Sequence, residues 1–378
     1  MVLEARALWT TGRRMRHVCV GLILTCGLIA AAPPPRLVAQ RANVTKGCVE
    51  RFDATTDYFP DKAAVEDATT FSVEYRRSYK VVRLKEAYPG GPPEQYVLVQ
   101  CGTPVPTLTG ALMGAQVVSI PITSLFAFST THLPLLVDLD RVDVLTGVAQ
   151  RDAVTSPEVQ ARLKAGQVVE FAKVGLVIDV ERVVSARPSL LMVGGTANAT
   201  LAVIRHAGVP VVANSEWIEP TALGRAEWLK YMALFLNEER KAQTVYGAMK
   251  HRYLALSARA TARPEAERPL VMAGKSARGQ FSIAGGRSYV AALIKDAGGD
   301  TRGPTTHPLG MHRSISRRRS GGQPSPTSGS TAGAGPIWGR CSRTNPGMPS
   351  SRRIGRVRCG SMNVESRHPG ATTTGLGA

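Results

Sequence analysis

Alternating apolar and polar residues predict a β-rich segment near the start of the chain. Phe71–Tyr75 reads Phe-Ser-Val-Glu-Tyr, and the apolar Tyr79–Val82 follows, so both segments are expected to form strands. A Gly-Gly-Pro-Pro turn at Gly90–Pro93 precedes a third strand, Tyr96–Val99. We therefore expect a β-rich N-terminal segment over residues 41–115.

Short apolar segments then alternate with helical ones. The predicted strands are Val117–Ile120, Ser124–Phe128, Pro188–Val193 and Val209–Val212. The predicted helices are the one that follows the Ser129-Thr130-Thr131 cap, Val180–Ser185 and Ala199–His206. Regular alternation of this kind is typical of a mostly parallel sheet covered by helices, so we expect a first α/β lobe over residues 116–221.

A long helical pattern separates this lobe from a second one. Apolar residues recur at close to helical spacing from Leu223 to Leu256, which predicts one linking helix over residues 222–260, roughly 50 Å long. A strand at Leu270–Met272 and a helix at Tyr289–Asp296 then indicate the start of a second α/β lobe over residues 265–305.

The two ends of the chain differ from this body in charge. The net charge is +19, but residues 1–41 carry +5, residues 301–378 carry +11, and residues 42–300 carry only +3. A total net charge of +19 would favour nucleic-acid binding, but the nearly neutral body at residues 42–300 does not support that function. Residues 1–40 are expected to be a signal peptide, because Arg13, Arg14 and Arg16 precede the apolar segment Val18–Ala32.

Export through this signal predicts a periplasmic or extracytoplasmic protein. The apolar segment is shorter than a typical membrane-spanning helix, although an N-terminal membrane anchor is the alternative interpretation. Cys26 offers a lipid-anchor site, but Leu24-Thr25 before it is a poor context. The body keeps two cysteines, Cys48 and Cys101, which in an oxidising compartment predict one disulfide; two buried thiols are the alternative.

Residues 306–378 have the composition of a wrong reading frame. This segment holds many Arg, Ser, Gly and Pro residues, no Lys and no apolar periodicity. The genetic code allows a shifted reading frame to be tested, in which each codon starts at the third base of the printed codon. One such frame permits the peptides Ala-Asp-Val-Trp, Pro-Arg-Tyr, Val-Trp and Gly-Asn-Asp-Tyr-Trp. We therefore expect a frameshift between about Thr305 and Gln323 that cuts the second lobe short and leaves a disordered tail. A disordered tail that binds nucleic acid is the alternative.

Four segments of the body carry a resemblance when they are taken in order, namely Phe126–Leu133, Asp179–Pro188, Glu219–Trp228 and Phe281–Tyr289. They resemble the substrate-binding proteins of ATP-binding-cassette (ABC) importers. The resemblance is to the helical-backbone class, which binds iron-siderophores, haem and cobalamin. The resemblance implies two Rossmann-like βα lobes joined by one long helix. It also implies a monomer that binds a ferric siderophore, haem or corrinoid between the lobes and delivers it to an ABC permease.

Catalytic chemistry finds no support in the sequence. The hydrolase, Cys-His and zinc motifs are missing, and His132, His206 and His251 are scattered, as packing or surface residues are. No enzyme activity, cofactor or metal site is therefore expected. A secreted α/β enzyme of unknown chemistry is the alternative function, and a basic nucleic-acid-binding protein is a weaker one.

The expected ligand contacts follow predicted strands, where loops of α/β folds bind ligands. They are Ser129, Thr130, Thr131, Glu216, Trp217, Phe281, Arg287 and Ser288. The alternative interpretations are that Ser129 is only a helix cap and that Trp217 and Phe281 are only packing residues. Helix N-termini at this edge suit an anionic ligand. In the family that the chain resembles, an acidic residue on the first lobe docks to the membrane permease. The matching position lies near residues 197–200, where this sequence has no acidic residue. Glu219 and Glu227 are expected to be cleft or helix-surface residues.

Overall fold

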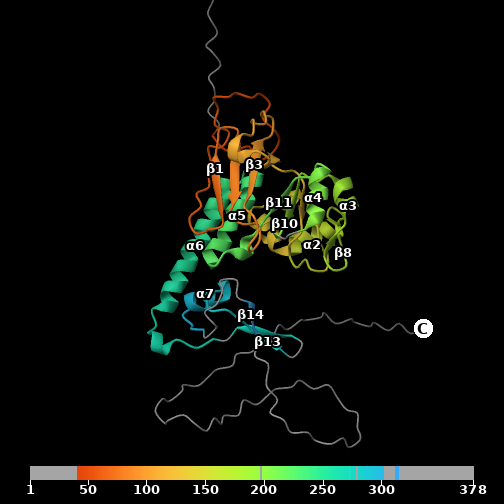
Figure 1. Ribbon diagram of the computed structural model, residues 1–378. Coiled ribbons are helices and arrows are strands. Elements are labelled where there is room, and N and C mark those ends of the chain that lie inside the picture. The colour runs from red at the N-terminus through yellow and green to blue at the C-terminus, as the bar shows by residue number, and fades with distance from the viewer. Residues whose placement is uncertain (1–40, 196–197, 272, 278–279, 302–310, 315–378) are drawn as a thin grey trace, which may run out of the picture. The chain divides into compact units, whose positions relative to one another are not determined.

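The computed structural model describes residues 41–195, 198–271, 273–277, 280–301 and 311–314 (Figure 1). The predicted signal peptide, including the possible lipid-anchor residue Cys26, lies outside these residues. The predicted frameshifted tail also lies outside them, apart from residues 311–314. Within the described part of the chain, no helix is both long and apolar enough to cross a membrane.

The N-terminal segment forms a four-stranded sheet in the order β1-β2-β3-β4. Its strands are β1 (Phe71–Tyr75), β2 (Tyr79–Leu84), β3 (Glu94–Gln100) and β4 (Gln116–Ile120). β1, β2 and β3 pair antiparallel, as the alternation predicted. β4 pairs parallel with β3, so the strand that we assigned to the first lobe belongs to this sheet instead.

The predicted disulfide joins Cys48 to Cys101, with their Cα atoms 4.7 Å apart. Beside it, the backbone N–H of Val49 donates to the carbonyl of Cys101 at 2.9 Å. The chain from residue 41 onward is thus tied to the end of β3.

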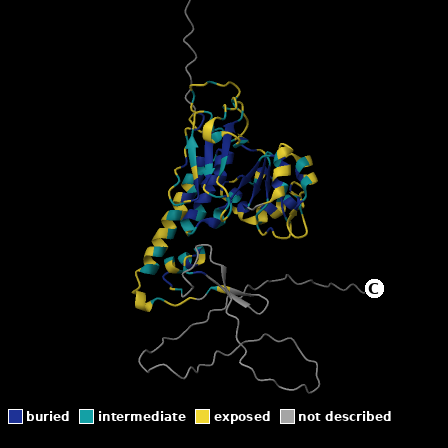
Figure 2. Ribbon diagram, viewed as in Figure 1, coloured by how far each residue is buried: buried dark blue, intermediate teal, exposed yellow. Residues whose placement is uncertain are grey.

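The first lobe holds a parallel sheet in the order β11-β10-β5-β6-β7, which confirms the predicted fold class. Its strands are β5 (Leu125–Ala127), β6 (Leu145–Val148), β7 (Val169–Glu170), β10 (Leu190–Val193) and β11 (Val211–Ala213). Every residue of β5, β10 and β11 is buried (Figure 2). Continuous apolar strands of this kind need cover on both faces.

Helices supply that cover from both sides. They are α1 (Leu133–Asp138), α2 (Pro157–Lys164), α3 (Val180–Ala186) and α4 (Ala199–His206). Val183 of α3 and Ile204 of α4 pack with Phe126 and Leu191 on one face of the sheet. Leu136 of α1 packs with the residues that point to the other face. A small hairpin, β8 (Ala172–Lys173) and β9 (Val177–Ile178), follows the edge strand.

The predicted single linking helix is wrong, because it is two helices. α5 spans Ala222–Leu236 and α6 spans Glu239–Thr261. Between them Asn237 adopts a left-handed conformation (φ 58°), which Asn tolerates better than most residues and which ends α5. The Asn237 side chain donates to the carbonyl of Val44 and to Gln100, and it accepts from Lys80 at 2.8 Å. Tertiary contacts with the N-terminal segment therefore hold the break.

Glu219 and Glu227 are not cleft or helix-surface residues. Their side chains are fully buried, and both accept hydrogen bonds from the N-terminal segment. Glu227 accepts the backbone N–H groups of residues 66–68 at 2.6–3.0 Å. Glu219 accepts those of Thr69 and Thr70 at 2.9–3.0 Å. The two carboxylates thus fix the chain that leads into β1.

The described part of the second lobe contains α7 (Tyr289–Asp296), which matches its predicted bounds. In the described part of the predicted strand Leu270–Met272 there is one parallel bridge, between Leu270 and Asp300, and Met272 lies outside the described residues. The other strands are β12 (Gly274–Ala277), β13 (Gln280–Ala284) and β14 (Met311–Ser314), which pair antiparallel. The 3-10 turns of the chain are η1 (Gly110–Leu112), η2 (Thr130–His132), η3 (Val142–Val144), η4 (Glu216–Ile218) and η5 (Glu265–Glu267).

The buried ion pair between Lys80 and Glu239 predicts a large loss of stability when one partner is removed. Both side chains are fully buried, and Asn43 also donates to Glu239 at 2.8 Å. Lys80→Met leaves this carboxylate without its cation, so the free energy of unfolding should fall by about 3–5 kcal/mol in urea titrations. Lys62→Met breaks the exposed pair with Asp57 and should cost less than about 1 kcal/mol. Equal losses for the two variants would contradict this interpretation.

The buried imidazole of His132 predicts a loss of stability in acid. Within the described residues neither ring nitrogen has a hydrogen-bond partner, and burial lowers the pKa of His132 to about 3. The unfolded chain binds a proton at this residue below about pH 6.5, whereas the folded chain does not. Between about pH 6.5 and about pH 3, the wild type should therefore lose up to about 1.4 kcal/mol per pH unit relative to His132→Leu. A pH-independent difference between the two unfolding curves would refute this assignment.

Candidate ligand-binding site

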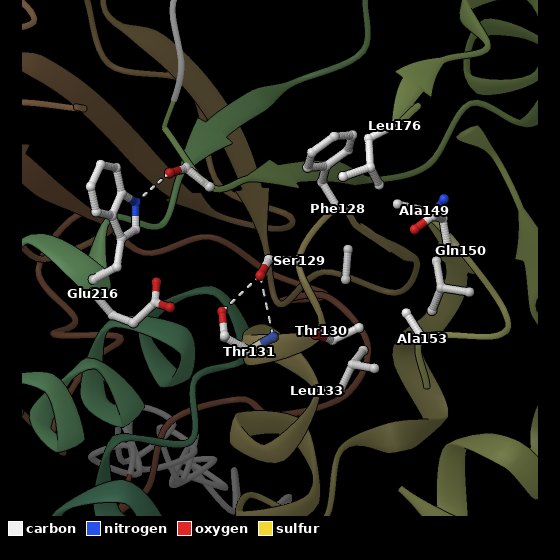
Figure 3. Close-up of a pocket in the computed structure, with 14 residues that line it drawn as sticks. Phe128, Ser129, Thr130, Thr131, Leu133, Ala149, Gln150, Ala153, Leu176 and Glu216 are labelled. Carbon is white, nitrogen blue, oxygen red and sulfur yellow. Dashed lines mark hydrogen bonds between the residues drawn. The ribbon is translucent and has the colours of Figure 1, made fainter. Parts of the chain in front are cut away.

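A pocket of about 420 Å³ lies at the carboxyl ends of the parallel strands β5, β6, β10 and β11 (Figure 3). This edge of a parallel sheet is where α/β folds bind ligands, because the loops that leave neighbouring strands meet there. The residues that line the pocket are Ala127, Phe128, Ser129, Thr130, Thr131, Leu133, Val148, Ala149, Gln150, Ala153, Leu176, Gly194, Glu216 and Trp217.

One side of the pocket is apolar. Phe128 follows β5, and its backbone N–H donates to the carbonyl of Met192 at 2.9 Å, which aligns the strand ends. Leu176 comes from the tip of the β8–β9 hairpin and lies beside Phe128 (Figure 3). Two residues before it on the hairpin, Val174 is 96% exposed. The hairpin that contributes Leu176 to the pocket therefore also exposes an apolar side chain to solvent.

Hydroxyl groups from the loop after β5 form part of the opposite side. Ser129 caps η2, as the sequence predicted, and its Oγ accepts the backbone N–H of Thr131 at 3.3 Å. The hydroxyls of Ser129 and Thr131 lie 2.8 Å apart and share a hydrogen bond. Both residues also line the pocket, so the capping role and a ligand-facing position occur together here.

Glu216 begins η4 directly after β11, and its carboxylate points toward Ser129 and Thr131 (Figure 3). Its Oε2 atom is buried and has no hydrogen-bond partner in the described part of the chain. Burial raises the pKa of Glu216, and the Thr131 hydroxyl and the charge of Arg225 oppose that rise. The pocket thus contains an acceptor that the protein itself leaves unsatisfied.

Trp217 is held in place by two hydrogen bonds. Its indole Nε1 donates to the carbonyl of Gly194 at 2.6 Å, and its own carbonyl accepts from Arg225 at 2.5 Å. The Arg225 guanidinium also stacks on the ring of Tyr289 in α7, 3.8 Å from its centroid. The orientation of Trp217 is therefore set before any ligand arrives.

Five of the predicted contacts are brought together in this pocket, namely Ser129, Thr130, Thr131, Glu216 and Trp217. Arg287 and Ser288 do not line it. Arg287 is exposed, whereas Ser288 caps α7 by accepting from Ala291 N at 3.3 Å and donates to the carbonyl of Gly285 at 2.6 Å. The side chain of Phe281 lies outside the described residues.

Sequence reasoning missed several lining residues, including Phe128, Gln150 and Leu176. The position of Phe128 at the end of a predicted strand could have indicated it, since strand ends meet at this edge. Metal ligation has no support in the described residues, where no group of three or more His, Cys, Asp or Glu side chains could hold an ion.

Comparison with known proteins finds similarity to periplasmic binding proteins. The family model for periplasmic binding proteins matches residues 127–313. An uncharacterized lipoprotein of Methanocaldococcus jannaschii is 22% identical over 165 residues, which are 40% of this chain and 39% of that protein. The alignment thus spans well under half of this curated relative.

Solved structures of periplasmic proteins are also similar to this chain. A periplasmic binding protein from Veillonella parvula has a TM-score of 0.46 at 13% identity, covering 65% of this chain and 71% of that one. A possible iron-binding protein from Staphylococcus epidermidis has a TM-score of 0.42 at 15% identity, covering 52% and 72%. A periplasmic heme binding protein from Pseudomonas aeruginosa has a TM-score of 0.39 at 20% identity, covering 51% and 66%. At these scores their ligands say nothing about the ligand of this chain.

The family match begins at β5 and includes every strand end that builds the pocket. The family is one of solute-binding proteins and not of enzymes, in agreement with the non-enzymatic interpretation of the sequence. Over residues 127–313, this chain matches the model of the periplasmic binding protein family.

Proposed function

We propose that this chain is an extracytoplasmic solute-binding protein that delivers a metal chelate to an ABC importer. A ferric siderophore is the first candidate ligand, and haem and cobalamin are the others. The observation that carries the proposal is the pocket at the carboxyl edge of the parallel sheet, where five residues predicted to contact the ligand meet.

The character of the pocket supports a ligand of this size and chemistry. Binding sites for organic molecules are typically concave and mostly apolar, with a few placed polar groups. Here Phe128, Leu176 and Trp217 supply apolar and aromatic surface, while Glu216 and the hydroxyls of Ser129 and Thr131 supply polar contacts. An immobilised Trp217 ring would pack on a planar or disc-shaped chelate with little loss of side-chain entropy.

The second lobe is proposed to complete the site through Phe281, Arg287 and Ser288. The reading-frame change proposed after Thr305 would leave that lobe short. Nucleotide sequencing across codons 300–325 tests this, because an uninterrupted printed frame would remove the proposal. Binding should therefore be measured on the chain as printed and on a frame-restored chain.

Truncating Trp217 is expected to weaken binding. Trp217→Ala removes an aromatic wall of the pocket. The Kd of the chelate that binds, whether ferric siderophore, haem or corrinoid, should therefore rise roughly ten-fold in calorimetric titrations. Phe52→Ala provides the matched control, because Phe52 is 39% exposed and stacks on Tyr58 outside the pocket. This control should leave the Kd unchanged. If none of these chelates binds to either chain, the proposed function is wrong. If Trp217→Ala binds as tightly as the wild type, the proposed site is wrong.

A further inference from the structure

Among the described residues that line the pocket, one side chain is ionisable, namely the carboxylate of Glu216. None of these described lining residues is Lys, Arg or His. A site built for an anionic ligand normally presents such cations, or free backbone N–H groups, to the charge. The charge of this first-lobe wall is therefore opposite to that expected for an anion site, and Arg287, the proposed second-lobe contact, does not line it.

Two N–H donors near the pocket are already used. The indole N–H of Trp217 donates to the carbonyl of Gly194, and the backbone N–H of Thr131 donates to Ser129 Oγ. The Ser129 and Thr131 hydroxyls bond to each other. Thr130 and Gln150 also line the pocket and can donate or accept. Among the described pocket-lining side chains, the buried polar atom that lacks a partner is an acceptor, Glu216 Oε2.

Arg225 does not satisfy this carboxylate. The guanidinium donates to the carbonyls of Glu219 and Trp217 at 3.2 and 2.5 Å and stacks on Tyr289. In the described part of the chain it forms no ion pair with Glu216. Arg225 acts on Glu216 only through its charge. Glu216 Oε2 therefore stays buried without a hydrogen-bond partner in the described part of the chain.

We infer that Glu216 selects an electrically neutral or cationic chelate that presents hydrogen-bond donors to its carboxylate, and that the pocket discriminates against anionic chelates. The inference rests on the proposed function and narrows its ligand class. The Glu216 carboxylate lines the pocket and favours a ligand that supplies a donor, whereas an anionic group placed beside it is repelled in a medium less polar than water. This inference differs from the expectation from sequence that helix N-termini at this edge suit an anionic ligand.

The candidate chelates divide clearly by this rule. A ferric trihydroxamate is neutral at its metal centre, because each hydroxamate contributes one negative charge, and ferrioxamine B adds a pendant ammonium group. Cyanocobalamin is neutral and carries amide donors at its periphery. Haem carries two carboxylates, and a ferric tris-catecholate is strongly anionic. The first two classes fit the pocket, and the last two do not.

The test compares four probes on the full chain at one pH and salt concentration. The probes are ferrioxamine B, cyanocobalamin, haem and ferric enterobactin. The wild type should bind ferrioxamine B or cyanocobalamin at least roughly ten-fold more tightly than either anionic probe. Glu216→Gln should reduce that preference by roughly ten-fold. Asp152→Asn is the matched control, because it makes the same charge change at an exposed residue that does not line the pocket. It should alter the preference between the probes less than two-fold, which is about the limit of such comparisons.

The outcomes separate this inference from the proposed function. An anionic probe that binds most tightly, and loses affinity in Trp217→Ala, supports the chelate-binding function but overturns the selectivity for neutral or cationic ligands. A preference that survives Glu216→Gln also overturns it. Because the wild-type ranking needs no variant, the inference can be rejected even if Glu216→Gln does not fold. Failure of all four probes to bind overturns both proposals.

Discussion

The arrangement of this protein depends on one buried ion pair, that of Lys80 with Glu239. Lys80 lies on β2 of the N-terminal sheet, and Glu239 begins α6, more than 150 residues later in the chain. Burial lowers the pKa of Lys80, and the carboxylate of Glu239 opposes this. Because a buried charge without its partner is costly, the N-terminal sheet and the junction of α5 and α6 are compatible in only one relative position.

This constraint extends to the ligand pocket through α5. The helix is buried on all sides, and its residues share one apolar core with both sheets. At the start of α5, Glu219 is fixed by Thr69 and Thr70, and Arg225 holds the carbonyls of Glu219 and Trp217. Ser215 is anchored in the same way, to the carbonyl of Ala87 at 2.5 Å. The N-terminal segment therefore supports the loop that carries Glu216 and Trp217 and sets the geometry of one pocket wall.

Sequence pattern predicted the parts of this protein whose structure is decided locally. Period-two alternation located β1, and the capped apolar segments located α4 and α7 with their observed bounds. The break at Asn237 was missed because its left-handed conformation is held by Lys80, Gln100 and Val44, which are remote in the chain. Glu227 was misplaced on a surface for a related reason. Helix α5 lacks a polar face, so even its charged residues lie in the core, where long-range partners satisfy them.

The pocket shows the same division between local and tertiary information. The residues after β5 and β11 could be predicted, because the ends of parallel strands converge whatever the details of packing. Leu176 could not, since the segment between residues 149 and 179 shows no clear periodicity and the hairpin tip reaches the pocket only in the folded chain. In this segment Ser156 and Pro157 mark the start of α2. A helix-start pattern of this kind does not indicate a ligand contact.

The distribution of charge makes the local chemistry of the pocket decisive. The total of +19 would attract anions at long range, but the stretch from residue 42 to residue 300 carries only +3. Charges at the far ends of the chain are screened over about 8–10 Å in physiological salt and have little effect on a ligand inside a pocket. A partly buried carboxylate is screened far less, because little water and salt surround it. Selection by charge at this site should therefore follow the sign of Glu216 and not that of the chain as a whole.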